Sequence, residues 1–392
     1  MGWLMLLANT VGAEAESWGR RLEQVEELRN AGSYDEAKAI VEGVIEEAAA
    51  QGDAATEAEG LYQLALVQYF LNEFDEARAT LEIGRTEATR NGLTQLEADF
   101  LNAEGVLEWK LGNLALAIPK LEAALEIQKA AEEWINMSSI ANNLGIIAYS
   151  LKDYATAVGY YQQGLEWLGD RDNDRMRASL YSNLAEVLIP MGQLDAAEDY
   201  LYKSLEIEHA AEEPRNIAYT YFNLGELYAR KGDSAKAIDR YRKALDLQLE
   251  LEDDWAISLT RLKYGKELWL TGKESESQTQ LALGFDVARE LNALALLRDY
   301  CSLLAEINEK AGNSSLAEYY SGLYAYFEER VDVDESDPIV TNKPPVAEAE
   351  ASSNGRRLLE SPLQAATILV LCLLITILVL ENTRLRKRMR DL

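Results

Sequence analysis

Side chains that commonly carry out catalysis are scarce in this sequence of 392 residues, which holds one histidine and two cysteines. His209 lies close to Glu206 and Glu208, and we interpret it as a solvated surface residue. Cys301 and Cys372 lie far apart, and with a single histidine they cannot supply the four ligands of a structural zinc site. The sequence therefore predicts no metal site, no cofactor and no enzymatic activity.

A column of amide side chains has a regular spacing that suggests binding. Asn143, Asn183 and Asn223 stand 40 positions apart, and Gln63 and Lys263 occupy the same place in the register. An asparagine side chain offers both a donor and an acceptor, so a row of them can hydrogen-bond the main chain of an extended peptide. The alternative is that these residues are merely polar positions on an exposed surface.

The same spacing of 40 runs through three columns of small residues, which divide the sequence into eight units. The first column is Ala37, Ala77, Ala117, Ala157, Ala197, Ala237, Ser277 and Ala317. The second, twelve positions earlier, is Ala65, Gly105, Gly145, Ala185, Gly225, Gly265 and Ala305, with Val25 in the first unit. Small residues at fixed places predict that two helices approach closely there.

The third column marks a turn inside each unit, five positions before the first column. It consists of Gly32, Asn72, Gly112, Lys152, Gly192, Gly232, Gly272 and Gly312. Glycine supplies the left-handed conformation that ends a helix, so Lys152 departs from the rule. Each unit is expected to be a helix, a tight turn and a second helix. Pro214 is expected in the first turn of a helix, whereas Pro119 and Pro190 fall inside helical patterns and predict kinks.

Particular residues at these places resemble the tetratricopeptide repeat. In the fourth unit they are Asn143-Leu144-Gly145, Tyr149, Lys152-Asp153-Tyr154, Ala157, Tyr161 and Leu165, and in the sixth Asn223-Leu224-Gly225, Tyr228, Gly232-Asp233, Ala237, Tyr241 and Ala244-Leu245. The common form of that repeat has about 34 residues, and the longer form here is similar to the repeats of kinesin light chains and of bacterial regulators. HEAT-type repeats share the period and lack this pattern of glycine and alanine.

The resemblance implies an all-α fold, a right-handed superhelical solenoid of about eight helix-turn-helix units over residues 17–330. It also implies a site, because in peptide-binding members of the family the Asn of the Asn-Leu-Gly pattern faces the concave groove. Asn143, Asn183 and Asn223 would then contact the peptide main chain. Ile146, Glu186 and Glu226, one turn further on, are the neighbouring candidates and would make the groove partly acidic.

The sequence outside the repeats predicts a membrane anchor. Residues 331–361 are acidic and then rich in Pro, Ala and Ser, which predicts a disordered tether. The apolar run Leu363–Leu380 predicts a transmembrane helix over residues 362–381. Residues 382–392 carry a basic cluster that favours a cytoplasmic tail, which would place the repeats on the extracytoplasmic side.

The first 16 residues allow two interpretations. They contain a short apolar stretch followed by small-residue patterns that end at Ala13 or Ala15, which is typical of a cleaved signal peptide, although a basic start is missing. Alternatively, they are the apolar beginning of the first helix.

The formal net charge of −29 makes nucleic acid an unsuitable ligand for the repeats, because phosphate binding needs a basic surface. The negative charge has two interpretations: it keeps the protein soluble, or it gives the repeats a preference for basic ligands. The function we predict is a membrane-tethered scaffold that binds a peptide or protein partner in its groove. Two alternatives remain: the sensory input part of a membrane signalling protein whose output domain is elsewhere, and a cytosolic tail-anchored adaptor.

Overall fold

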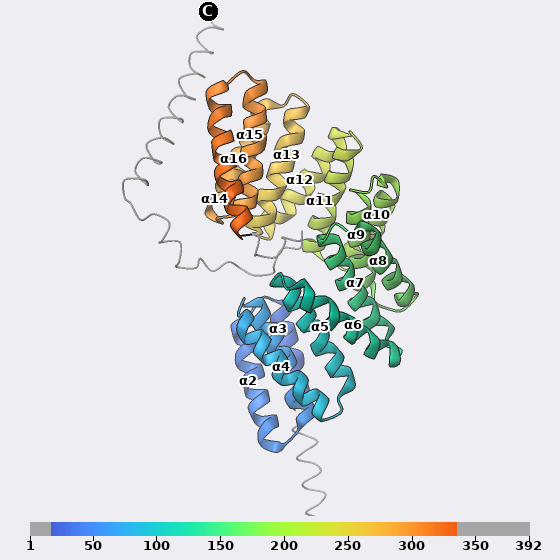
Figure 1. Ribbon diagram of the computed structural model, residues 1–392. Coiled ribbons are helices and arrows are strands. Elements are labelled where there is room, and N and C mark those ends of the chain that lie inside the picture. Colours follow the sequence, from blue (N-terminus) through green and yellow to red (C-terminus); the bar gives the residue numbers. More distant parts are fainter. Residues whose placement is uncertain (1–16, 335–392) are drawn as a thin grey trace, which may run out of the picture. The chain divides into compact units, whose positions relative to one another are not determined.

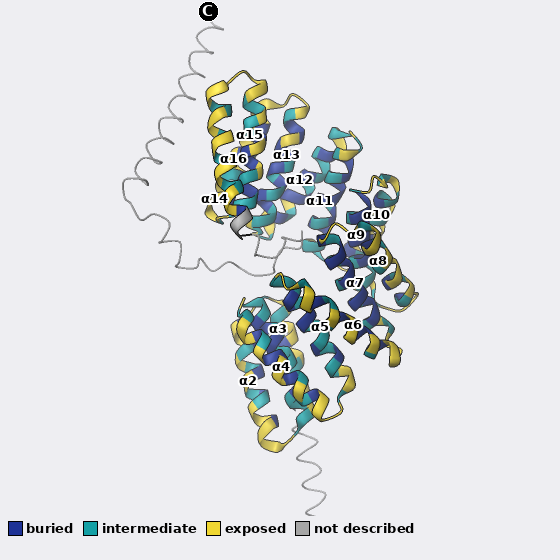
Figure 2. Cartoon of the chain, in the orientation of Figure 1, coloured by how far each residue is buried: buried dark blue, intermediate teal, exposed yellow. Residues whose placement is uncertain are grey.

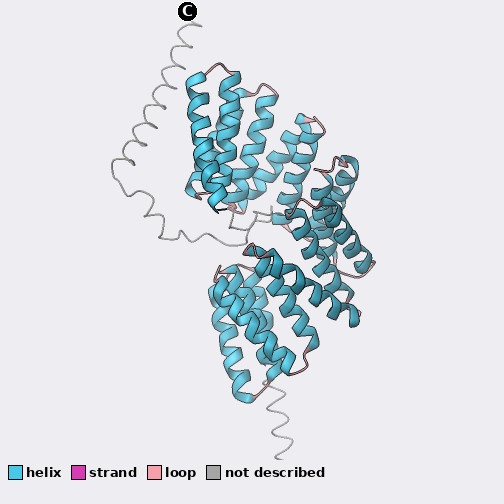
Figure 3. Cartoon of the chain, viewed as in Figure 1, coloured by secondary structure: helices cyan, strands magenta, loops and turns pink. Residues whose placement is uncertain are grey.

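The computed structural model describes residues 17–334, and every regular element in that range is an α-helix (Figure 3). Residues 17–30 form the first helix. The helices that follow are α2 (Tyr34–Gln51), α3 (Ala54–Phe70), α4 (Phe74–Arg90), α5 (Thr94–Lys110), α6 (Leu114–Ala130), α7 (Trp134–Ser150), α8 (Tyr154–Leu168), α9 (Asp174–Leu188), α10 (Leu194–Ala210), α11 (Pro214–Arg230), α12 (Ser234–Glu250), α13 (Asp254–Leu270), α14 (Glu274–Glu290), α15 (Leu294–Lys310) and α16 (Ser314–Asp334).

The helices alternate between two positions in a repeat solenoid. We call the first helix of each unit the A helix (residues 17–30 and α3 to α15, odd numbers) and the second the B helix (α2 to α16, even numbers). The A and B helices of one unit pack together, and each B helix from α2 to α14 also contacts the next A helix (Figure 1). The A helices of neighbouring units touch one another, as α3 touches α5, whereas no comparable contact joins neighbouring B helices among the described residues. The A helices therefore line the inner side of the stack.

The A and B helices of one unit meet at the predicted small residues. A Cβ atom added to Gly145 would lie 2.5 Å from the ring of Tyr161, and one added to Gly225 would lie 2.5 Å from the ring of Tyr241. Both rings are buried, and Ala157 at the predicted contact in the B helix is buried as well. The predicted close approach is thus confirmed, and its reason is that a large side chain in the B helix fills the space left open in the A helix.

A further column of small residues, outside the three described above, lies between the units. Gly84 in α4 faces the ring of Phe100, and a Cβ atom added to Gly164 in α8 would lie 2.9 Å from the side chain of Leu180. Gly284 stands in the same register, since these positions differ by multiples of 40. Each interface in the stack, within a unit or between units, therefore depends on its own column of small residues.

All eight turns inside the units pass through the left-handed region, as the third column predicts. Lys152 has a φ of 60°, close to the 75° of Gly192. Between residues 17 and 334, six non-glycine residues adopt positive φ: Asn72, Glu132, Lys152, Glu212, Glu252 and Asn292. Such a conformation costs roughly 1–2 kcal/mol for an L-residue, so the packing of the flanking helices must impose it.

Two of the three prolines lie where the sequence analysis predicts them relative to the helices. Pro214 is the first residue of α11, and Pro119 lies inside α6. The expectation that Pro190 lies within a helix is wrong, because α9 ends at Leu188. Proline has no N–H with which to continue the helical hydrogen-bond pattern, and here the helix stops before it.

The end of the solenoid lies later than predicted. α16 continues to Asp334, so the first four residues of the predicted tether are helical. Leu323, Phe327 and Val331 are four positions apart, and this apolar spacing extends the helix. Most residues of α16 are exposed or half-buried (Figure 2), and Ala317 is only half-buried there.

The predicted leader, the remainder of the predicted tether, the transmembrane helix at residues 362–381 and the basic tail lie outside the described residues. Between residues 17 and 334, no helix is both long enough and apolar enough to cross a bilayer.

Overpacking a small-residue contact is expected to destabilise the solenoid. Ala157→Leu forces a larger side chain into a fully buried contact and should cost about 1–3 kcal/mol in the free energy of unfolding. His209→Ala, on the surface, should change it by less than about 0.5 kcal/mol. Urea unfolding of the two variants measures the difference, and equal midpoints would show that residue 157 is not at a packed interface.

Candidate binding site

The predicted amide column lies at the contacts between neighbouring A helices. The Nδ2 of Asn183 donates to the Oδ1 of Asn142 at 2.7 Å, and the Nδ2 of Asn143 donates to the Oδ1 of Asn102 at 2.9 Å. Asn183 and Asn223 are only 7% and 3% exposed, and Asn143 is half-buried. The expectation that all three amides are exposed is therefore wrong, because their side chains link one A helix to the preceding one.

We call the row of amides that bond between neighbouring A helices the amide ladder. It is interrupted at Asn223, the third predicted amide. Asn223 would pair with position 182, where a serine replaces the asparagine found at positions 102 and 142. The Nδ2 of Asn223 and the Oγ of Ser182 are both buried without a hydrogen-bond partner among the described residues. Of the three predicted amides, Asn143 alone keeps enough exposure to meet a ligand directly.

The two predicted carboxylates are half-buried and already engaged. Glu186 accepts a hydrogen bond from the hydroxyl of Tyr219 in α11. Glu226 accepts a hydrogen bond from Tyr241 and forms an ion pair with Lys263 at 3.1 Å. Burial and the negative charge of Glu186 raise the pKa of Tyr219, so its hydroxyl remains a donor. This part of the inner face is acidic by composition, as predicted. Its two carboxylates, however, already bond to side chains of neighbouring helices.

The structure contains an apolar cavity that the amide column does not indicate. It has a volume of about 190 Å³ and lies between α3 and α5 with part of α4 beneath it. Its lining residues are Tyr62, Ala65, Leu66, Tyr69, Phe70, Ala77, Leu81, Asn102, Ala103, Val106 and Leu107. An apolar cavity of about 150 Å³ holds a benzene molecule, so this one has room for an apolar side chain.

A second, smaller cavity lies at the predicted site. Val106 also lines a smaller cavity of about 20 Å³, together with Trp109, Asn143 and Ile146. Two of the predicted residues, Asn143 and Ile146, thus lie next to the apolar surface of the preceding unit. The sequence does contain a pattern that predicts this apolar surface, because Leu66, Val106 and Ile146 are 40 positions apart and are all apolar.

The edge of the large cavity carries an unusual carboxylate. Asp99 in α5 has no hydrogen bond or ion pair with another described residue. Burial, with the nearby charges of Glu59 and Glu133, raises the pKa of Asp99 to about 6. Asp99 also raises the pKa of Tyr62, which lines the cavity. A partly buried carboxylate without a partner, beside an apolar cavity, is a candidate for ligand recognition.

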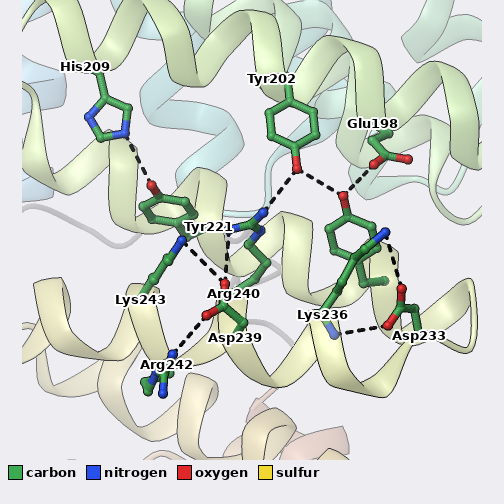
Figure 4. A network of polar contacts seen from close by, with 11 residues as sticks. Glu198, Tyr202, His209, Tyr221, Asp233, Lys236, Asp239, Arg240, Arg242 and Lys243 are labelled. Atoms are coloured by element: carbon green, nitrogen blue, oxygen red, sulfur yellow. Dashed lines mark hydrogen bonds and ion pairs between the residues drawn. The ribbon is translucent and has the colours of Figure 1, made fainter.

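A second polar cluster lies on α10, α11 and α12 (Figure 4). His209 is exposed, as predicted, with its Nε2 3.3 Å from the hydroxyl of Tyr221. The hydroxyl of Tyr228 is 3.0 Å from that of Tyr202 and donates to Glu198 at 2.5 Å. The hydroxyls of Tyr202 and Tyr228 and the carboxylate of Glu198 bond to one another between α10 and α11, so we assign these three groups a role in holding units five and six together.

Comparison with known proteins identifies the class. Family models of the tetratricopeptide repeat match residues 96–167 and 176–250, and a further one matches residues 58–82. The chain therefore contains tetratricopeptide repeats, which confirms the resemblance for the repeat region. No curated protein matches the sequence.

Three solved structures show the same fold at low sequence identity. A Rap protein complexed with competence and sporulation factor has 18% identity and a TM-score of 0.56, covering 81% of this chain and 99% of that one. The Rap conjugation gene regulator of the plasmid pLS20, in complex with the Phr* peptide, has 17% identity and a TM-score of 0.54, covering 73% and 78%. A signal transduction ATPase with a tetratricopeptide repeat sensor from Pyrococcus horikoshii has 13% identity and a TM-score of 0.60, covering 81% and 51%.

The amide ladder is expected to contribute to stability. Asn183→Ala leaves the buried Oδ1 of Asn142 without its donor and should cost about 1–3 kcal/mol in the free energy of unfolding. Asn223→Ala is the matched control and should cost less, because the Nδ2 that it removes makes no hydrogen bond. Urea unfolding of both variants tests this order, and a larger loss for Asn223→Ala would contradict it.

The unpaired carboxylate is expected to destabilise the protein above its pKa. The folded chain holds the proton of Asp99 up to about pH 6, whereas the unfolded chain loses it near the ordinary aspartate pKa of 3.8. Stability from this group is therefore present below about pH 4 and is lost as the pH rises to about 6. Asp99→Asn should raise the free energy of unfolding at pH 7.5 by ~1 kcal/mol, a figure reduced for solvent screening.

Unfolding curves of wild type and Asp99→Asn at pH 4 and pH 7.5 measure this effect. Glu82→Gln removes an exposed carboxylate of α4 and serves as the control, with the same stability as wild type at both pH values. Equal stability of Asp99→Asn and wild type at pH 7.5 would show that Asp99 is solvated.

Proposed function

We propose that the chain is a scaffold that binds an extended segment of a peptide or protein partner along the A helices of units two to four. The observation that carries this proposal is the apolar cavity between α3 and α5, together with the smaller cavity at Asn143 and Ile146, which shares the lining residue Val106 with it. An extended segment spans about 3.3 Å per residue, so a short stretch of peptide reaches from one A helix to the next. The proposal assigns binding, and no catalytic step, to this surface.

The architecture supports the proposal. In a solenoid, each helix is held by its neighbours in the stack, so inner positions of the A helices that make no contact between helices can differ from unit to unit. The cavity is open and apolar, whereas the hydroxyls of Tyr202 and Tyr228 in the polar cluster already have partners within it. Two proteins with a similar fold were solved with a peptide or factor bound, which agrees with this use of the architecture.

We further propose that the scaffold is tethered to a membrane on its extracytoplasmic side. The support is in the sequence alone: the apolar run Leu363–Leu380, the basic cluster after it and the apolar start of the chain. The tether would hold the binding surface near the bilayer, where a partner is captured.

Filling the cavity is expected to abolish peptide binding. Ala103 lines the cavity, and Ala103→Phe places a ring inside it. Ala123→Phe makes the same change at an exposed position of the B helix α6 and is the control. Peptides selected by the full chain from a random displayed library should bind Ala103→Phe at least ~10-fold more weakly, the equivalent of about 1.4 kcal/mol, and Ala123→Phe as tightly as wild type.

Two results would contradict the binding proposal. One is a library from which the full chain enriches no peptide. The other is a set of selected peptides whose binding is lost in Ala123→Phe and kept in Ala103→Phe, which would place the site on the B helices.

The membrane anchor and the cleavage of the leader are both expected to be detectable in the mature protein. Removing residues 363–380 should release the chain from alkali-washed membranes, and the intact mass of the mature protein should lack the residues up to Ala13 or Ala15. A membrane-bound chain that retains Met1 would contradict the extracytoplasmic placement and would favour the cytosolic tail-anchored adaptor.

A further inference from the structure

Two carboxylates border the cavity at equivalent places of two neighbouring A helices. Glu59 in α3 and Asp99 in α5 are 40 positions apart. Each precedes a cavity-lining residue of its own helix by three positions, Tyr62 for Glu59 and Asn102 for Asp99. Residues three apart share a face of a helix, so both carboxylates lie on the side that carries the cavity. Their charges both raise the pKa of Tyr62.

Asp99 differs from the two deeply buried carboxylates of α5, Glu104 and Glu108, in having no cation. Glu104 and Glu108 are more deeply buried than Asp99. Glu104 pairs with Arg85 at 2.7 Å and with Lys120, and Glu108 pairs with Arg78 at 2.9 Å. The chain thus supplies a cation to each deeply buried carboxylate of this helix and leaves the one beside the cavity unpaired.

Arg29, whose charge acts on the cavity residue Tyr62, is engaged elsewhere. Arg29 donates to the Oε1 of Gln63 at 2.6 Å, and Gln63 donates in turn to Glu59 at 3.1 Å. Asp99 receives neither bond. A metal ion does not fit, because no group of three or more His, Cys, Asp or Glu side chains that could hold one occurs between residues 17 and 334.

We propose that the segment bound in this cavity carries an apolar side chain that fills the space between α3 and α5 and a neighbouring lysine or arginine that pairs with Asp99 and Glu59. This inference rests on the proposed function and specifies its ligand. Charge complementarity carries it: an apolar cavity bordered by two carboxylates, one of them unpaired, in a chain of net charge −29. A charge-assisted hydrogen bond in such a partly buried place is stronger than one in water.

The same arrangement predicts a pH dependence of binding. The titratable groups that face Asp99 are Glu59 and Tyr62 from α3 and Glu133, which lies just before α7. Tyr62 is neutral. A cation from the ligand favours the ionised form of Asp99, so binding competes with its proton. Affinity for a basic segment should rise as the pH increases through about 6, where Asp99 titrates.

A displayed library of random peptides tests the ligand chemistry on the full chain. Wild type is expected to enrich peptides with an apolar residue next to Lys or Arg. The double variant Glu59→Gln with Asp99→Asn should still enrich the apolar residue and lose the basic neighbour. Enrichment in wild type of apolar residues without a basic bias, or with an acidic one, would overturn this inference and leave the proposed function standing. No enrichment by either protein would overturn both.

A single peptide then tests the pairing. One enriched sequence, acetylated and free of histidine so that its only cation is the side chain, is titrated by fluorescence anisotropy at pH 5 and pH 7.5. Wild type should bind roughly fivefold to tenfold more tightly at pH 7.5, Asp99→Asn should lose that difference, and the control Glu82→Gln should keep it. A pH-independent affinity that is equal in wild type and Asp99→Asn would overturn the pairing.

Discussion

The close approach of neighbouring helices is the constraint on which this structure depends. At most of these contacts a small residue in one helix leaves room for a large side chain from the next, as Gly145 does for Tyr161 and Gly164 does for Leu180. Two interfaces with this design, one inside the unit and one between units, repeat along the chain. They are strong enough to hold Lys152 and five other non-glycine residues in the left-handed region, where the turn residues alone would not favour the hairpin.

Because the interfaces carry the stability, the inner positions of the A helices can differ from unit to unit. The register that contains Ile146 is apolar in units two to four, at Leu66, Val106 and Ile146. It becomes acidic in units five and six, at Glu186 and Glu226, whose carboxylates bond to tyrosines from neighbouring helices. The inner face thus has an open apolar part and a closed polar part, and the first is the one suited to binding.

Electrostatics separates structural carboxylates from the one that we assign to recognition. Glu104 and Glu108 are buried and each has a basic partner, so their charge is compensated within the fold. Asp99 is less buried and has no such partner, and its raised pKa reflects the cost of ionising it. A protein tolerates such a cost at a site where a ligand removes it, which is the physical reason to place the ligand's cation at Asp99.

The sequence by itself determined the repeat architecture, because the period of 40 and the small residues at fixed places allow only closely packed helical hairpins. It also predicted where the turn inside each unit lies, although at Lys152 the packing of the flanking helices, and not the residue type, imposes the left-handed conformation. The ends of α9 and α16 differ from the sequence prediction. α9 stops before Pro190, and the apolar spacing up to Val331 extends α16.

Only the tertiary structure decided what the amide column does and where the cavity lies. A sequence shows that Asn183 is on the inner side of a helix. It does not show that Asn142, 41 positions earlier, is close enough to bond and bury it. The cavity likewise depends on the distance between α3 and α5, which the packing of α4 beneath them sets, and no single residue in its lining reveals it.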